Sequence, residues 1–258
     1  MKSVTQLILP SLVLIGSFFA SDTIACTTSL WNGGETGSPV ADSPLAVSRV
    51  SGLCAMKIEA AGSVTDNSPL TEATANIRFY VYADLSSGAP VVFEAFSADD
   101  GGGNSLITVS FDGTNFVFDA GAGASGNVPG AAGWNLVEMA WTGGVDMDYW
   151  VNADATLSPA TGNVSAAAGT MESVVLGTED AFTGSLTFDA YEAHRASPVG
   201  ALLAGDGNND DAINSGDINV IVNEFLSGNL GEGVPDCNLD GAVNSGDINC
   251  VVAIFLNL

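Results

Sequence analysis

Two segments near the end of the chain place oxygen-bearing side chains at the same spacing, thirty residues apart. Positions 1, 3, 5, 9 and 12 of the two segments are Asp206, Asn208, Asp210, Asn214 and Asp217, and then Asp236, Asn238, Asp240, Asn244 and Asp247. Alternate residues of such a tight turn point inward, and the backbone carbonyl of position 7, here Ala212 or Ala242, adds one more oxygen. Carboxylate and amide oxygens without His or Cys suit Ca²⁺, and a cage this rich in protein ligands suits Mg²⁺ less well. The spacing therefore predicts two loops that each bind one Ca²⁺ ion.

The residues around these ligands predict how the two loops fold. Position 6 needs a sharp turn, which Gly241 permits in the second loop, whereas Asp211 adopts a left-handed conformation at some cost and predicts a weaker first site. The apolar residues at position 8, Ile213 and Val243, are expected to pack together through a short β contact. After each loop, apolar residues recur at helical spacing, as Ile218, Ile221, Val222, Phe225 and Leu226, and then as Ile248, Val251, Val252, Phe255 and Leu256. We therefore expect each loop to lead into a helix that buries one apolar face.

The two loops, each followed by a helix with one apolar face, resemble a type I dockerin, and the resemblance covers about residues 204–258. It implies a small α-helical, EF-hand-like calcium-binding domain at 205–258 that docks onto a cohesin-like protein partner. An ordinary EF-hand pair is the nearest rival, but position 12 carries Asp where the EF-hand has Glu. The chain departs from the dockerin pattern at loop positions 10 and 11, which read Ser215-Gly216 and Ser245-Gly246, and no Lys or Arg follows Arg195. The resemblance therefore carries over the calcium chemistry and leaves the partner open.

The larger region before the loops alternates apolar and polar residues with the period of β-strands. Ile77, Phe79 and Val81 share one face of such a strand, and further short strands fall near 92–96, 106–109 and 116–118. Many short strands separated by Gly-rich turns predict a mainly β fold, a β-sandwich over residues 26–194. Residues 134–194 resemble the closing strands of a laminin G or concanavalin-like jelly roll, which implies a sandwich that commonly binds carbohydrate. Pro198 and Gly200 mark residues 195–204 as a linker.

The sandwich sequence offers no catalytic residues. A polysaccharide-degrading enzyme of this shape would need two carboxyl groups flanking the glycosidic bond. Asp146 and Asp148 share a strand face but are better explained as a solvated edge, and the one histidine, His194, lies at the end of the domain beside Arg195. A third class, an adhesive surface or matrix protein, also fits. Four tryptophans could stack on sugars, although core packing is favoured for each: Trp31, Trp134, Trp141 and Trp150.

Composition and the start of the chain predict where the protein works. The sequence has 5 Lys and Arg against 30 Asp and Glu, a formal net charge of −25, which excludes nucleic acid as a partner. Residues 1–25 combine Lys2, an apolar run and a small-residue cleavage site, so they predict a signal peptide and a secreted protein. Cleavage there would leave Cys26 first, which keeps a lipid anchor open. No later apolar stretch is long enough to span a membrane.

Four cysteines in an exported chain predict two disulfides, with three connectivities open. Proximity in the sequence favours Cys26 with Cys54 and Cys237 with Cys250. The first repeat has Gly207 and Val220 at the positions that Cys237 and Cys250 occupy in the second. Both cysteines are thus present together in one copy, as a crosslink requires.

Overall fold

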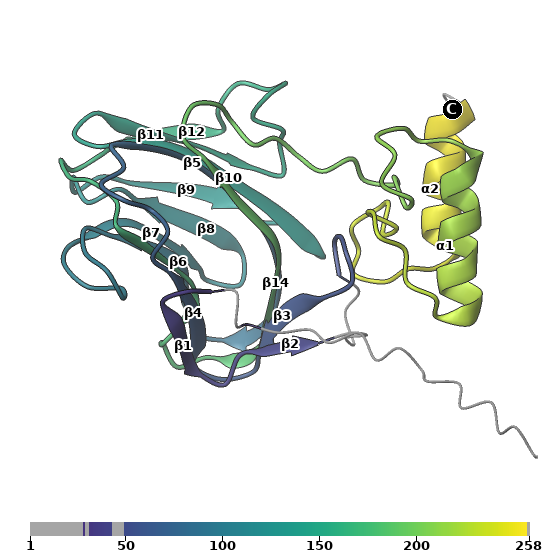
Figure 1. The fold of residues 1–258 in the computed structure, drawn as a ribbon, viewed down its shortest axis with the longest axis horizontal. Coiled ribbons are helices and arrows are strands. Elements are labelled where there is room, and N and C mark those ends of the chain that lie inside the picture. Colours follow the sequence, from purple (N-terminus) through teal and green to yellow (C-terminus); the bar gives the residue numbers. More distant parts are fainter. Residues whose placement is uncertain (1–27, 29–30, 43–48, 257–258) are drawn as a thin grey trace, which may run out of the picture.

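The computed structural model describes residue 28 and residues 31–42 and 49–256, and it consists of a β-sandwich with two helices beside it (Figure 1). The predicted signal peptide at 1–25 and Cys26 lie outside the described residues. In the described part, no helix has the length and apolar character needed to cross a bilayer.

Two seven-stranded antiparallel sheets form the sandwich, which confirms the predicted mainly β, jelly-roll-like fold followed by a small helical part. The first sheet, sheet A, has the order β1 (Gly34–Gly37), β4 (Gly62–Asp66), β13 (Ser173–Thr178), β6 (Val91–Phe96), β7 (Ser105–Phe111), β8 (Asn115–Asp119) and β9 (Ser125–Pro129). Sheet B has the order β12 (Gly162–Ser165), β11 (Asp146–Val151), β10 (Trp134–Thr142), β5 (Thr74–Ser87), β14 (Thr183–His194), β3 (Ala55–Ile58) and β2 (Val40–Asp42).

The alternating strand pattern builds the core between the two sheets. Ile77, Phe79 and Val81 of β5 are fully buried there, and the ring of Phe79 stacks on that of Phe93 from sheet A, 5.5 Å away. Trp141 of β10 lies in the same core, as its strand position predicted. The alternation thus fixes which face of each strand points inward.

Part of the outer face of sheet B is also buried, because the C-terminal part of the chain covers it. Tyr80, Trp134 and Leu136 form a second apolar cluster there, which includes Val50 and Val234. Trp134 is therefore buried, as expected, but beneath the C-terminal segment rather than between the sheets. Trp150 is also buried, and Trp31 is partly buried.

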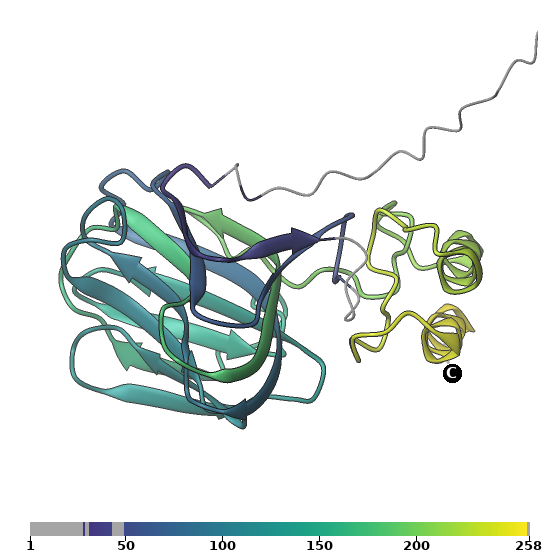
Figure 2. The same ribbon diagram turned by 90° about the horizontal axis from the view of Figure 1, so that it is seen from below.

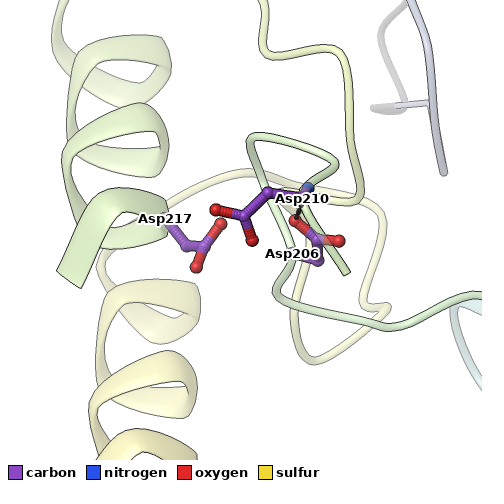
Figure 3. A group of neighbouring side chains, drawn as sticks. All are labelled: Asp206, Asp210 and Asp217. Atoms are coloured by element: carbon purple, nitrogen blue, oxygen red, sulfur yellow. Dashed lines mark hydrogen bonds between the residues drawn. The ribbon is translucent and has the colours of Figure 1, made fainter. Parts of the chain in front are cut away.

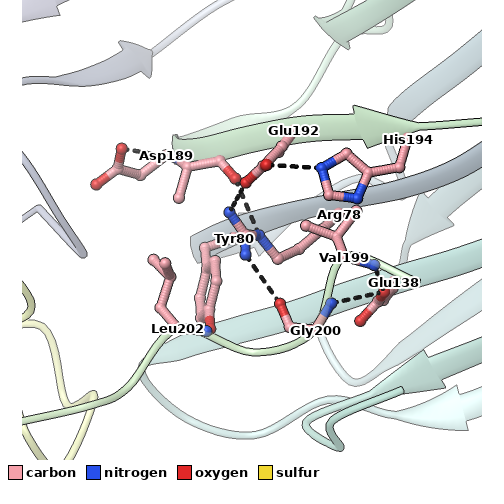
Figure 4. A network of polar contacts seen from close by, with 10 residues as sticks. Arg78, Tyr80, Glu138, Asp189, Glu192, His194, Val199, Gly200 and Leu202 are labelled. Carbon is pink, nitrogen blue, oxygen red and sulfur yellow. Dashed lines mark hydrogen bonds and ion pairs between the residues drawn. The ribbon is translucent and has the colours of Figure 1, made fainter. Parts of the chain in front are cut away.

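Residues 195–204, which we call the strap, run without helix or strand from β14 toward the loops and lie against sheet B (Figure 4). The carboxylate of Glu138 accepts the backbone N–H groups of Val199 and Gly200, at 2.7 and 3.0 Å. The Arg78 guanidinium donates to the Gly200 carbonyl at 2.8 Å. The Tyr80 hydroxyl accepts the Leu202 N–H at 3.0 Å. The predicted linker is thus fastened to the sheet by buried polar side chains.

The two helices, α1 (Ser215–Ser227) and α2 (Ser245–Leu256), lie side by side at one end of the molecule (Figure 2). Asn214 caps α1 and forms a capping box with Asp217, and Gly228, in a left-handed conformation, ends the helix. Only part of each predicted apolar face is buried. Ile221 and Val251 are completely buried, but the last turns of both helices leave Phe225, Leu226, Ile254, Phe255 and Leu256 exposed.

Candidate metal centre

The first loop brings three of its predicted ligands together (Figure 3). Asp206, Asp210 and Asp217 each offer a carboxylate oxygen, and these oxygens all lie within 4.8 Å of one another. Asp206 and Asp217 are 3% and 0% exposed, whereas Asp210 is exposed. Two buried carboxylates and one exposed carboxylate therefore converge on one point that is open on the Asp210 side.

Backbone N–H groups hold the two buried carboxylates in place. Asp206 accepts the N–H groups of Asp210 and Asp211, at 3.1 and 2.9 Å. Asp217 accepts those of Asn208 and Asn214, at 3.3 and 2.8 Å. Because both carboxylates are hydrogen-bonded to the loop backbone, the loop is wrapped around the side chains of Asp206 and Asp217.

The second loop repeats these contacts residue for residue. Asp236 accepts the N–H groups of Asp240 and Gly241 at 3.1 and 2.8 Å, and Asp247 accepts those of Asn238 and Asn244 at 3.2 and 2.8 Å. The side-chain amide of position 3 also donates to the carboxylate of position 5 in both loops, at 2.9 and 3.0 Å. In both loops, the position 9 amide donates to the position 7 carbonyl, at 3.2 Å from Asn214 to Ala212 and 2.8 Å from Asn244 to Ala242. The sequence repeat is thus a repeat of conformation.

Position 6 is left-handed in both loops, as the sequence predicted. The φ angle is 63° at Asp211 and 92° at Gly241. A Cβ on Gly241 would lie 2.4 Å from the Cε2 atom of Tyr82 in β5, so glycine is required there for space as well as for conformation.

The donor set fits a hard divalent cation. Ca²⁺ takes six to eight oxygen ligands at about 2.3–2.6 Å, so its ligand oxygens lie within roughly 5 Å of one another. The three carboxylates of the first loop meet this condition, and amide oxygens of positions 3 and 9 and the carbonyl of position 7 belong to the same short loop. A divalent cation among these three carboxylates would offset their mutual repulsion.

A small apolar core and one disulfide join the loops to the helices. Cys237 and Cys250 form the predicted disulfide, with Cα atoms 6.0 Å apart. Cys54 is disulfide-bonded as well, and its predicted partner Cys26 lies outside the described residues. Ile213 and Val243 pack against this core, but no β bridge joins the two loops in the described part of the chain, so the expected β contact was wrong.

The module that the two loops and helices form is docked on the sandwich through a buried ion pair. Arg49, which precedes β3, donates to both carboxylate oxygens of Glu224 in α1, at 2.6 and 3.0 Å, and both side chains are at most 7% exposed. The backbone N–H of Trp134 donates to the backbone carbonyl of Leu239 in the second loop at 2.8 Å. No local sequence pattern indicated the ion pair, because its partners are 175 residues apart.

Other polar residues of the sandwich make structural contacts. Asp146 and Asp148 both accept from the side-chain amide of Asn163, at 3.2 and 2.7 Å, at the edge of sheet B. His194 contacts Glu192 at 2.9 Å, and Glu192 also pairs with Arg78 at 2.7 Å (Figure 4). In these contacts the acidic pair and the histidine have different partners, Asn163 and Glu192.

Burial raises the pKa of Asp189 to about 6. The carboxylate also accepts hydrogen bonds from the backbone N–H groups of Ser51, Ala190 and Val50, and these bonds lower the pKa but only partly offset the effect of burial. Asp189 lies in β14 and holds the segment that carries Arg49. It therefore supports the docking of the module from the side of the sandwich.

No protein-family model and no curated protein matches this chain. Similar solved structures include the receptor-binding domain of the botulinum neurotoxin C/D mosaic serotype, at 11% identity and a TM-score of 0.46, covering 66% of this chain and 45% of that one. The neurotoxin serotype D ligand-binding domain in complex with N-acetylneuraminic acid is 11% identical, with a TM-score of 0.43 and coverage of 61% and 43%. The cellulose-induced protein Cip1 is 13% identical, with a TM-score of 0.46 and coverage of 65% and 88%. This chain spans less than half of the two neurotoxin chains, and likenesses this distant assign none of their ligands to it.

Proposed function

We propose that the C-terminal module binds two Ca²⁺ ions and that these ions hold it folded. One site would use Asp206, Asn208, Asp210, the carbonyl of Ala212, Asn214 and Asp217, and the other would use Asp236, Asn238, Asp240, the carbonyl of Ala242, Asn244 and Asp247. The observation that carries the proposal is the convergence of three carboxylates within 4.8 Å in a loop whose side-chain hydrogen bonds recur in the second repeat.

Helix capping alone does not account for this arrangement. A capping box explains Asn214 and Asp217, because they satisfy free N–H groups at the start of α1. It does not involve Asp206 or Asp210, whose carboxylates also lie beside that of Asp217. Carboxylates this close repel one another at neutral pH unless a cation lies between them.

Calorimetry on the full-length protein tests the calcium sites. We expect heat from two binding events, the first loop being the weaker site, and loss of helical circular dichroism when a chelator is added. An absence of calcium heat, together with a spectrum that the chelator does not change, would contradict the proposal.

We further propose that the protein is exported and that the module serves assembly, in the manner of the dockerins it resembles. The exposed apolar residues at the ends of both helices, among them Phe225 and Phe255, offer a surface for a protein partner. Surface plasmon resonance against an immobilised type I cohesin, in calcium and in chelator, tests a cohesin-like partner. Sequencing the N-terminus of the mature protein tests removal of residues 1–25.

A second proposed function is carbohydrate binding by the sandwich, and it is favoured by the exposure of outward side chains on its sheets. The strap and the module cover part of sheet B, and outward side chains on sheet A, such as Glu94, Thr108 and Val117, are partly exposed. A glycan array probed with the full-length protein tests this function against the alternatives of an adhesive matrix protein and a polysaccharide hydrolase. Release of reducing sugar from a bound polysaccharide would indicate the hydrolase.

A further inference from the structure

The outer face of sheet A holds a groove of about 460 Å³ over β1, β4, β13 and β6. This volume lies in the range of about 300–1,000 Å³ that is typical of small-ligand sites. Thr36 of β1 and the largely buried Ser63 and Thr65 of β4 line one side, where the hydroxyls of Thr36 and Ser63 are hydrogen-bonded to each other at 2.8 Å, and Glu94 of β6 lines the other. From these observations, and on the basis of the carbohydrate-binding function proposed above, we infer that this groove binds an uncharged glycan through Glu94.

Glu94 is an acidic residue of the groove with hydrogen-bonding capacity to spare. Among the described residues, its Oε1 atom accepts from the hydroxyls of Ser105 and Thr108, each at the long distance of 3.5 Å. The neighbouring Asp180 carboxylate, by contrast, accepts the Val91 N–H at 3.0 Å. Burial raises the pKa of Glu94, and the nearby charges of Asp180 and Glu179 add to this effect. A half-buried carboxyl group of this kind readily bonds the hydroxyl groups of a sugar.

The floor beside Glu94 is small and partly apolar. Val175 and Gly177 of β13 and Phe96 of β6 lie in the groove. Gly177 has a φ of 110°, and a Cβ there would lie 2.5 Å from the Gly62 carbonyl oxygen, so this position stays without a side chain. A sugar ring combines C–H surfaces with outward hydroxyls, and the apolar part of this floor matches the C–H surfaces while Glu94 matches the hydroxyls.

The charge of the groove selects against anionic glycans. Five carboxylates line it, those of Glu35, Glu94, Asp100, Glu179 and Asp180, and the described residues that line it include no Lys, Arg or His. An acidic sugar such as a sialic or uronic acid would be repelled by these groups. The groove is therefore expected to take a neutral chain of hexose or pentose units.

The test is binding of full-length protein to neutral and acidic glycans on an array, followed by calorimetry with the best neutral oligosaccharide. We expect Glu94→Ala to weaken binding at least tenfold and Glu94→Gln to weaken it less, because the amide oxygen still accepts hydrogen bonds. Asp148→Ala is the matched control, since Asp148 is also a partly exposed carboxylate within a strand, but in sheet B. We expect its affinity to equal that of the unmodified protein.

Two results would overturn the inference, and they differ. If the unmodified protein binds no glycan, the carbohydrate-binding function itself fails. If it binds a glycan but Glu94→Ala and Asp148→Ala have the same affinity, the function stands and the groove is not its site. Binding only to acidic glycans would also overturn the inference. Thermal melting of each variant shows that any lost binding is not lost folding.

Discussion

At positions 1 and 12 of each loop, an aspartate is almost completely buried while its carboxylate accepts hydrogen bonds from the backbone. A buried charge without a countercharge is costly, even with such bonds. In the first loop these residues are Asp206 and Asp217, which are 3% and 0% exposed. Calcium binding and folding of the module are therefore expected to share most of their free energy.

The exposed carboxylate at position 5, a proposed ligand, gives a direct test of the expected coupling between calcium binding and folding. Asp240 accepts the N–H of Ala242 and the side-chain amide of Asn238, so it forms one wall of the second loop. We expect Asp240→Ala to abolish the second calcium site and to leave the first, as measured by calorimetry. Glu232→Ala, a change at an exposed acidic side chain outside both loops, is expected to keep two sites. Two unchanged sites in Asp240→Ala would remove Asp240 from the ligand set.

Asp189 makes a pH-dependent contribution to stability. Its pKa of about 6 in the folded protein lies above the ordinary value of 3.8, so the folded state binds more protons between these values. Its contribution to the free energy of unfolding is thus fully present below about pH 4. This contribution, roughly 3 kcal/mol, is lost as the pH rises through 6.

An asparagine side chain cannot ionise, so Asp189→Asn should lack this dependence. We expect the free energy of unfolding of the variant, relative to the unmodified protein, to rise by about 3 kcal/mol between pH 4 and pH 7. Urea unfolding of both proteins at several pH values measures the difference. Parallel pH profiles would show that Asp189 titrates normally.

At the scale of elements, the ion pair between Arg49 and Glu224 fastens α1 to the sandwich. Removing one partner leaves the other charge buried, so we expect Arg49→Ala to lower the free energy of unfolding by about 3–5 kcal/mol. The double variant Arg49→Ala and Glu224→Ala should lose less than the sum of the two single changes to Ala. A double-mutant cycle in urea measures this coupling.

Arg195→Ala serves as the control for that cycle. Arg195 pairs with Glu72, but its side chain is 70% exposed, so its loss should cost less than about 1 kcal/mol. Equal costs for the two arginines would mean that the docked arrangement is not maintained in solution.

Local patterns predicted the elements, and long-range contacts decided how they meet. The alternation at Ile77, Phe79 and Val81 was sufficient to predict a sandwich strand, and the repeat at Asp206 and Asp236 was sufficient to predict two similar loops. Both patterns depend on residues that are close together in the sequence. They can therefore be recognised before the three-dimensional fold is known.

The docking and the groove were not predictable in this way. Tyr80 and Trp134 occupy outward positions of their strands, and only the strap and the module make those positions buried. Glu94 resembles any outward carboxylate until β4 and β13 are placed beside β6. Contacts between segments this far apart leave no local pattern in a single sequence.

At the scale of the whole molecule, calcium in the module should stabilise the sandwich. The module packs against part of the outer face of sheet B, so its unfolding would expose Tyr80, Trp134 and Leu136 to water. We expect a chelator to shift tryptophan fluorescence to longer wavelength and to lower the melting temperature of the sandwich by several degrees. Trp134→Phe should remove most of the fluorescence shift but keep the change in melting temperature. An unchanged sandwich transition in chelator would show that the two parts are energetically independent.

The disulfide decides how the module would respond to mechanical load. It links Cys237 to Cys250 and so encloses Asn238, Asp240, Ala242, Asn244 and Asp247, all proposed ligands of the second ion. Tension applied at the end of α2 would pass through the sulfur atoms to Cys237 and bypass these residues. The first loop has Gly207 and Val220 at the equivalent positions, so its backbone would carry the full force. A pull that opens the first loop should therefore leave the second loop closed around its ion.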